Sequence, residues 1–194
     1  EPDVICYSAA ISSCANGGAW TRALALLGEM QQDALVPNVF SYSSAITACE
    51  KGGEWTKALG LLREMVQGGI NANTITCSAA ISACEKGGEW MKALQILSTM
   101  EKEQIEANVI TYNTAISACA KGARWMKALE LIGIMAHERM ETNTITCNAA
   151  ISACEKGGES SRAVELLGLM AQRRIELDTI TYGAAISACE KGGE

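Results

Sequence analysis

Four rows of chemically related residues recur along the chain at a spacing of 35 residues. The first row is apolar and comprises Ile5, Phe40, Ile75, Ile110, Ile145 and Ile180. The second row carries short hydroxyls or amides, except at its last place, and comprises Ser8, Ser43, Ser78, Asn113, Asn148 and Gly183. The third row begins with Asn16 and continues as Lys51, Lys86, Lys121, Lys156 and Lys191. The fourth row comprises Asn38, Asn73, Asn108, Asn143 and Asp178.

The four rows together have the chemistry that binding of single-stranded RNA requires. An apolar side chain can sandwich a flat base, a hydroxyl or amide can hydrogen-bond a base edge, and a lysine can neutralise a phosphate. A structural interpretation competes with this one. The apolar row can flank the core, the short polar row can fill a helix surface, and a lysine is favourable near a helix C-terminus. The residues alone leave both interpretations open.

Other kinds of site lack their residues in this sequence. Six of the nine cysteines also stand 35 residues apart, no CxxC pair occurs, and His137 is the single histidine. Because a zinc site needs closely paired ligands, we expect neither a metal nor another cofactor, and we interpret the cysteines as small buried side chains in a reducing compartment. No activated nucleophile and no phosphate-binding loop pattern is present, so we expect no catalysis within these residues.

The composition is that of a folded, soluble protein. The chain has 194 residues, 48% of them hydrophobic and 20% charged, and its formal net charge is −6. A net negative charge confines any RNA-binding surface to one face. Glutamates such as Glu50 and Glu155 directly precede row lysines, and neighbouring side chains point about 100° apart on a helix. We therefore expect the lysines to face a groove and the glutamates to be solvated charges at the turns.

The elements that must position the four rows follow from hydrophobic periodicity. In the stretch from Tyr42 to Met65, apolar or small residues recur at helical spacing in two stripes that Gly52 and Gly53 separate. Each stripe predicts an amphipathic helix, and the glycine pair predicts a tight turn. Similar pairs recur once per period, up to Gly192 and Gly193, with Gly122 and Ala123 as the single variant. Each unit is therefore predicted to be a helical hairpin.

Such a hairpin cannot bury both apolar stripes alone, so neighbouring hairpins must stack. The expected fold class is an all-α solenoid of stacked antiparallel helical hairpins in one domain. The expected units are residues 4–38, 39–73, 74–108, 109–143 and 144–178, with a partial sixth unit, 179–194, that holds a first helix only. The tryptophan row from Trp20 to Trp125 and the methionine row from Met30 to Met170 are interpreted as core. The chain opens and closes in mid-pattern, and we expect it to be a fragment of a longer protein.

The residues VITYNTAISACAKGARWMKALELIGIMAHERMETN at 109–143 carry a family resemblance. Their length, the TYN opening, the AISACAKG turn and the ALEL…M second helix resemble a pentatricopeptide repeat of the plain class, and the resemblance covers essentially the whole chain. It implies a right-handed superhelix. It also implies sequence-selective binding of single-stranded RNA in a mitochondrion or plastid (chloroplast), at one base per repeat, in support of RNA processing, stability, editing or translation.

The resemblance also implies a role for each row. In this family the apolar row sandwiches bases, the second and fourth rows read them, and the lysines contact phosphates. Serine with asparagine favours adenine, two asparagines favour a pyrimidine, and asparagine with aspartate favours uracil. The implied target is 5′-AAAYU-3′, with the RNA running 5′ to 3′ from the N-terminus to the C-terminus of the protein.

Two further functions stay open. A helical solenoid also presents grooves that bind peptides, so a protein-interaction scaffold is one alternative, with protein partners in RNA-processing complexes. The other alternative is the RNA-binding arm of an enzyme whose catalytic domain lies outside these residues. The second and fourth rows are confined to small polar residue types while their neighbours vary, and this favours RNA over a peptide.

Overall fold

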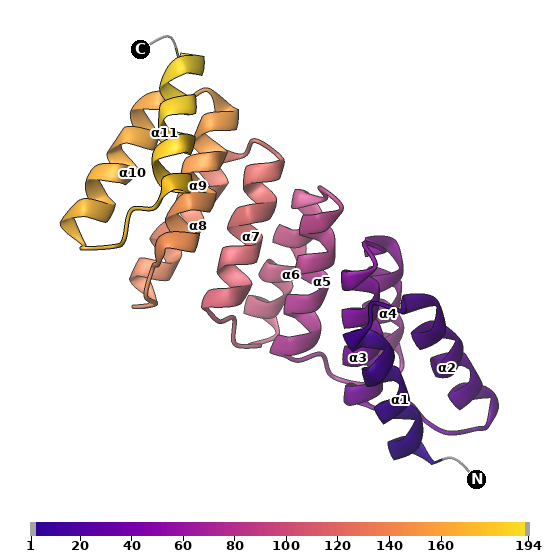
Figure 1. The fold of residues 1–194 in the computed structure, drawn as a ribbon. Coiled ribbons are helices and arrows are strands. Elements are labelled where there is room, and N and C mark those ends of the chain that lie inside the picture. The colour runs from indigo at the N-terminus through magenta and orange to yellow at the C-terminus, as the bar shows by residue number, and fades with distance from the viewer. Residues whose placement is uncertain (1–2, 193–194) are drawn as a thin grey trace. The chain divides into compact units, whose positions relative to one another are not determined.

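The structure is a computed structural model that describes residues 3–192, and within that range eleven α-helices are its only helices or strands (Figure 1). The helices are α1 Val4–Asn16, α2 Trp20–Gln32, α3 Val39–Lys51, α4 Trp55–Gln67, α5 Thr74–Lys86, α6 Trp90–Lys102, α7 Val109–Lys121, α8 Trp125–His137, α9 Thr144–Gly157, α10 Ser160–Gln172 and α11 Thr179–Gly192. The predicted all-α fold class is confirmed. Gly193 and Glu194, predicted to end the sixth unit, lie outside the described residues. None of the described helices combines the length and the apolar character that a membrane span requires.

The chain divides into two compact units. The first unit contains α1 to α5 and α6 from Met91 onward, and the second contains α7 to α11. In the first unit, α1 pairs with α2 and α3 pairs with α4, while α1, α3 and α5 pack side by side. In the second unit, α7 pairs with α8 and α9 with α10, while α7, α9 and α11 pack side by side (Figure 1). Each unit is therefore a stack of helical hairpins, as a solenoid requires. The handedness of the superhelix and the exact repeat boundaries stay predictions.

The core consists of residues that repeat with the sequence period. The fully buried isoleucines of the odd-numbered helices are Ile11, Ile46, Ile81, Ile116 and Ile151, and the fully buried methionines of the even-numbered helices are Met30, Met65, Met100, Met135 and Met170. Alanines such as Ala45 and Ala115, also without exposed surface, stand between the odd-numbered helices. Because alanine is small, adjacent helix backbones can approach closely there. Each hairpin thus depends on its neighbour for burial.

The buried cysteines belong to this core. Burial raises the pKa of the Cys49, Cys119 and Cys154 thiols to about 11, which keeps them protonated near neutral pH. Among the described residues, no group of three or more histidine, cysteine, aspartate or glutamate side chains is placed to hold a metal ion.

Where a turn has two glycines, the two have different physical roles. The second glycine, for example Gly53 with φ +75°, adopts the left-handed conformation that lets the chain reverse between the helices. The first glycine has helical φ, −77° at Gly87, but a β-carbon there would clash with the indole ring of Trp55 from the preceding hairpin. Gly52 has the same relation to Trp20. The half-buried tryptophans therefore contact the next turn, which is where a packing role predicts them.

This difference predicts two different costs for a glycine-to-alanine change. Gly87→Ala should lower the free energy of unfolding by about 2–3 kcal/mol, because a methyl group must displace the Trp55 indole in a packed interface. Gly53→Ala meets no neighbouring atom within 4 Å and should lower it by about 1 kcal/mol, through backbone strain alone. Urea denaturation of both variants measures the two values. If Gly53→Ala proves the more damaging, the contact between glycine and indole is not the dominant constraint.

Candidate nucleic-acid interface

The fourth row of the sequence lies at the start of the odd-numbered helices. Each row residue is the N-cap of the next helix, and its side-chain Oδ1 accepts a hydrogen bond from the backbone N–H three residues on. In α9, the Asn143 Oδ1 lies 3.0 Å from the Thr146 nitrogen, and the Thr146 hydroxyl accepts from the Asn143 N–H at 3.2 Å. This reciprocal pair is a capping box. The confinement of the row to asparagine and aspartate therefore has a structural cause, since both residues are preferred N-caps.

The capping bond decides which atoms remain available at the surface. An asparagine has one side-chain oxygen, and here that oxygen faces the helix N-terminus, so its amide N–H groups are left to face outward. An aspartate has a second oxygen. The Asp178 Oδ1 accepts the capping bond from Thr181, and this hydrogen bond is the largest cause that lowers the pKa of the Asp178 carboxyl. Asn143 thus presents donors to the surface, whereas Asp178 presents an acceptor.

The second row lies one turn further along each odd-numbered helix and is more buried than its predicted role requires. Ser8 is 4% exposed and Ser43 is 8% exposed. The Ser8 hydroxyl bonds to that of Ser41 at 2.8 Å, and the Ser43 hydroxyl donates to the Val39 carbonyl at 2.7 Å. These hydroxyls are engaged inside the protein. The two serines therefore offer no free hydroxyl at the surface, and their small side chains leave room there for a ligand.

Asn113 and Asn148, at the same row position in the second unit, are only half-buried. The Asn113 Oδ1 accepts from the Thr146 hydroxyl at 2.6 Å, and the Asn148 Oδ1 accepts from the Thr181 hydroxyl at 2.6 Å. The Asn148 Nδ2 also donates to both Asp178 oxygens, at 3.1 and 3.3 Å. The structure thus brings Asn148 and Asp178 into direct contact. It joins Asn113 and Asn143 through the shared Thr146 hydroxyl, which lies 3.0 Å from the Asn143 Oδ1.

The remaining residues of the second and fourth rows make fewer contacts with one another. Ser8 and Asn38 are joined through the Ser41 hydroxyl, which lies 3.1 Å from the Asn38 Oδ1. Asn73 caps α5. Ser78 is half-buried on α5 in the first unit, and Asn108 caps α7 in the second.

The apolar row is exposed at every position. The exposed fractions are Ile5 76%, Phe40 55%, Ile75 65%, Ile110 69%, Ile145 66% and Ile180 67%. Large apolar side chains at a repeating position are normally buried between helices, as the isoleucines two turns further on are. The interpretation of this row as core-flanking packing is therefore wrong. Its place in the fold leaves it available to a ligand.

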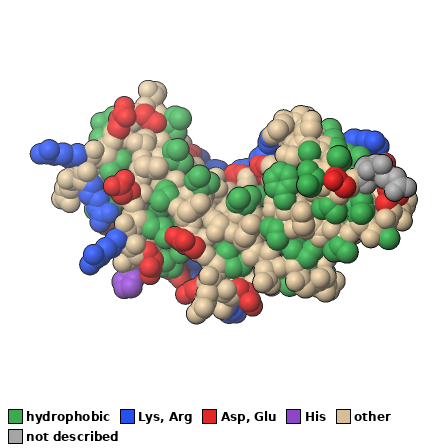
Figure 2. All heavy atoms as spheres, turned by 90° about the horizontal axis from the view of Figure 1, so that it is seen from below, with side chains coloured by type: hydrophobic (Ala, Val, Ile, Leu, Met, Phe, Trp, Pro, Cys, Tyr) green, Lys and Arg blue, Asp and Glu red, His purple; other side chains and the backbone are tan. Residues whose placement is uncertain are grey.

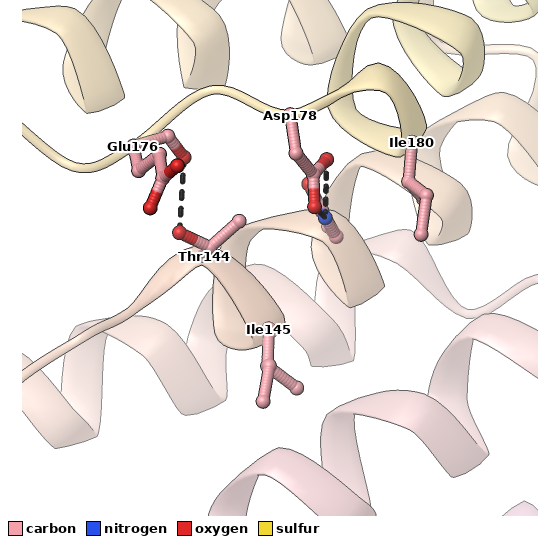
Figure 3. Close-up of a pocket in the computed structure, with 6 residues that line it drawn as sticks. Thr144, Ile145, Glu176, Asp178 and Ile180 are labelled. Atoms are coloured by element: carbon pink, nitrogen blue, oxygen red, sulfur yellow. Dashed lines mark hydrogen bonds between the residues drawn. The ribbon is translucent and has the colours of Figure 1, made fainter.

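One depression shows how the rows combine. It lies in the second unit, has a volume of about 420 Å³, and is lined by Thr144, Ile145, Asn148, Glu176, Asp178 and Ile180 (Figure 3). Its apolar lining comes from Ile145 on α9 and Ile180 on α11, and its polar lining includes Asn148 and Asp178. The Thr144 hydroxyl donates to the Glu176 carbonyl at 2.9 Å and fastens the segment that carries Asp178 to α9. The depression therefore combines apolar and polar lining residues from three of the four rows.

Comparison with known proteins identifies the family. The model of the pentatricopeptide repeat domain matches residues 60–122 and 131–192, the PPR repeat family model matches residues 2–51, and the PPR repeat model matches residues 40–70 and 110–140. The chain belongs to the pentatricopeptide repeat family. No curated protein matches the sequence.

Solved pentatricopeptide repeat structures share the fold. PPR10 from maize, in complex with an 18-nt psaJ RNA element, is 21% identical with a TM-score of 0.71, over 99% of this chain and 27% of that one. The PPR domain of Arabidopsis thaliana protein-only RNase P 1 in complex with tRNA is 12% identical with a TM-score of 0.79, over 93% of this chain and 95% of that one. The nuclear protein-only RNase P 2 of A. thaliana is 14% identical with a TM-score of 0.84, over 100% of this chain and 44% of that one. The chain thus spans about a third of the length of the PPR10 chains it matches.

In this pentatricopeptide repeat array, the lysine row is exposed but its members differ in their partners. The Lys86 ammonium pairs with the Glu50 carboxylate, and the Lys191 ammonium pairs with that of Glu155 at 2.8 Å. The side chains of Glu50 and Glu155 are only 14% and 17% exposed, and each also accepts a hydrogen bond from a serine hydroxyl of the next odd-numbered helix. The expectation that these glutamates are solvated turn charges is wrong. They are clasps between consecutive pentatricopeptide repeats.

Where the clasp glutamate is missing, the lysine has no such partner. Ala15 and Ala120 stand at the positions of Glu50 and Glu155. Among the residues that the structure describes, Lys51 and Lys156, one repeat further on, form no ion pair. Acidic side chains on the face shown in Figure 2 are interspersed with basic and hydrophobic ones. The net charge of −6 is therefore not gathered into one acidic patch on that face.

Sequence reasoning missed the buried hydroxyls that join the reading rows across pentatricopeptide repeats. These are the hydroxyls of Ser41, Thr146 and Thr181, all with no exposed surface. Their signal is present in the sequence as asparagine or aspartate followed three residues later by serine or threonine, a capping-box pattern. The glutamate clasp has no comparable signal, because its partner stands 36 residues away.

The clasp predicts an acid-sensitive contact. The hydrogen bond from Lys191 is the largest cause that lowers the pKa of the Glu155 carboxyl below its ordinary value. Stability from this pair is therefore fully present above the carboxyl's ordinary pKa of about 4.3 and is lost as the pH falls through the lowered value. Lys191→Met should raise the pKa of Glu155 toward the ordinary value, as a ¹³C NMR titration of the carboxyl would measure. Lys127→Met, which breaks an ion pair on α8, is the control and should leave Glu155 unchanged. An unchanged midpoint in Lys191→Met would contradict the clasp.

Proposed function

We propose that this chain is a sequence-selective reader of single-stranded RNA that binds one base per repeat. The observation that carries the proposal is the depression lined by Ile145, Ile180, Asn148 and Asp178. Exposed isoleucines can stack on both faces of a base, while the polar pair reaches the base edge. The same arrangement of row residues recurs with the sequence period. PPR10, which shares the fold, is solved with an RNA element bound.

The capping bonds support a rule for the base at each site. An asparagine N-cap presents an N–H donor, which matches a base whose ring nitrogen is an acceptor, namely N1 of adenine or N3 of cytosine. An aspartate N-cap presents an acceptor, which matches the ring N–H of uracil or guanine. Asn38 and Asn73 therefore favour adenine or cytosine, and Asp178 favours uracil or guanine. At the fourth site, Asn143 favours cytosine over uracil.

The second row then selects by size. Ser8 and Ser43 are small and buried, so they leave room for a purine. Asn113 and Asn148 are larger and half-buried, so they leave room for a pyrimidine. Size and hydrogen bonding together select adenine at the first two sites, cytosine at the fourth and uracil at the fifth. At these four sites the selection agrees with the target 5′-AAAYU-3′, and it narrows Y to cytosine.

A peptide-binding scaffold is the competing function. The limited residue types of the fourth row do not count against it. The confinement of the fourth row to asparagine and aspartate follows from helix capping and would persist without RNA. The exposed apolar row and the depression that it lines together with Asn148 and Asp178 carry the distinction instead. An arm of a larger enzyme is also consistent with the fold, because two neighbours are RNase P proteins of A. thaliana.

The fold does not fix the compartment. The family implies a mitochondrial or plastid location, whereas one of the structural neighbours is described as a nuclear protein. A mitochondrial or plastid location therefore stays a prediction from the family. The processing step that the RNA binding serves, and any protein partners in RNA-processing complexes, are likewise expectations from the family.

Selection from a randomised RNA pool tests the proposed function. The wild-type chain should enrich an A-rich stretch followed by C and U. The double variant Asn148→Ser with Asp178→Asn should enrich adenine at the fifth base, because its pair becomes equivalent to that of the first site. The double variant also serves as the positional control, since enrichment at the first four bases should not change. No enrichment over a matched DNA pool would move the assignment to a protein scaffold.

The lysine row predicts a graded salt dependence of RNA affinity. Each phosphate neutralised by a free lysine contributes about −0.7 to the slope of log affinity against log salt. Lys156→Ala should therefore reduce the slope by about 0.7, because Lys156 has no internal partner among the described residues. Lys86→Ala is the matched control and should reduce it by less than half as much, because Glu50 already holds that ammonium. Equal effects from the two variants would contradict the role assigned to the clasp.

A further inference from the structure

The buried hydroxyl of Thr146 lies between the two residues that face the fourth base site. Its oxygen is 2.6 Å from the Asn113 Oδ1 and 3.0 Å from the Asn143 Oδ1, and it accepts from the Asn143 backbone N–H. Asn113 belongs to α7, whereas Thr146 belongs to α9 of the following hairpin. Thr146 has no exposed surface. It cannot touch a bound base, yet it holds a side chain that would.

In the hydrogen bond between Thr146 and Asn113, the donor and the acceptor can be assigned from their chemistry. A threonine hydroxyl has one proton, and the shortest of its contacts is to Asn113 Oδ1, an atom that can only accept. This bond turns the Asn113 oxygen inward and leaves its amide N–H groups toward the open side of the helix. Among the described residues, the Asn113 side chain has no other hydrogen-bond partner. The hydrogen bond from the Thr146 hydroxyl is therefore the only one that fixes the orientation of this amide.

We propose that Thr146 is a specificity-determining positioning residue: its buried hydroxyl sets which edge of the Asn113 amide faces the fourth base. The proposal rests on the proposed function and deepens it, because it adds a third residue, contributed by the following hairpin, to the reading pair of the fourth site. Thr181 has the same relation to Asn148 at the fifth site. The role is therefore built into the junction between hairpins.

The orientation of the Asn113 amide matters because it decides whether the site matches cytosine or uracil. With its oxygen turned inward, Asn113 presents a donor beside the donor of Asn143. Cytosine offers two adjacent acceptors, N3 and O2, to such a pair, whereas uracil offers an acceptor beside a ring N–H. Once the amide is free to turn over, Asn113 can present its oxygen to the uracil N–H while Asn143 donates to a uracil carbonyl. A released amide accepts both pyrimidines.

The chain contains two graded comparisons. At the fifth site, Asn148 is held by Thr181 and also by both Asp178 oxygens, so loss of the Thr181 hydroxyl leaves a second restraint. At the second site, Thr76 makes the same capping-box bonds to Asn73, but the Ser43 hydroxyl donates to the Val39 carbonyl. Thr76→Val therefore loses the same capping bond as Thr146→Val without releasing a base-reading side chain.

The test measures affinities for RNA oligonucleotides that contain AAACU or AAAUU. The wild-type chain should prefer the first, and Thr146→Val should lower that preference by about threefold or more, as expected for one lost orienting hydrogen bond. Thr146→Ser retains the hydroxyl and should keep the wild-type ratio. Thr181→Val should lower the U-over-C preference at the fifth base by a smaller factor. Thr76→Val should leave the preference for adenine at the second base unchanged.

A second measurement does not require RNA. The NMR heteronuclear relaxation of the Asn113 side-chain amide in the free protein should report a rigid group in the wild type and a mobile one in Thr146→Val. An amide that stays rigid in Thr146→Val, or a C-to-U ratio that does not fall, overturns the role of Thr146. Loss of the proposed function is recognised separately, because the wild-type chain itself would then show no base preference while the amide still became mobile in the variant. That result also removes the specificity role.

Discussion

The side-chain cap at the start of each odd-numbered helix is the interaction on which both the fold and the candidate surface depend. A helix begins with backbone N–H groups that have no partner within the helix, and asparagine or aspartate supplies one. Asp178, which ends the linker and caps α11, also lines the depression described in the second unit. Stability and recognition therefore share a side chain. The atom used for the cap decides the atom left for a ligand.

The exposed isoleucines show the opposite relation between stability and recognition. Each hairpin buries its methionine and a central isoleucine at no exposed surface, yet leaves a second large apolar side chain, an isoleucine or Phe40, more than half exposed. Removing that surface from water would stabilise the array, at about 25 cal/mol for each Å². In the free protein, every repeat lacks this stabilisation because its row side chain stays exposed. A stacking ligand would recover it, which gives binding an apolar contribution that salt does not weaken.

Much of this architecture could be predicted from the sequence because the same pattern of apolar residues and glycines recurs in each repeat. The buried Ile46 and Met65, the turn at Gly53 and the apolar row at Ile145 all follow from periodicity and from the conformational needs of glycine. What could not be predicted depends on the rotation between neighbouring hairpins. That rotation sets Glu155 against Lys191 and buries Ser8 and Ser43. A periodic pattern specifies which side of a helix is apolar, but not how closely a polar side chain on its flank approaches the next repeat.

The contact between tryptophan and the first glycine of the next turn has a consequence for how such arrays can be rearranged. It makes each junction a matched pair, in which a large ring on one hairpin requires a bare backbone on the following one. A hairpin transplanted into this array must therefore satisfy a rule at both of its edges. The fifth hairpin follows the same rule although Ser160 replaces the ring, because a β-carbon at Gly192 would lie only 2.5 Å from the Ser160 Oγ and 2.7 Å from its Cβ. The requirement for a bare backbone therefore comes from the closeness of consecutive hairpins and does not depend on the size of the ring.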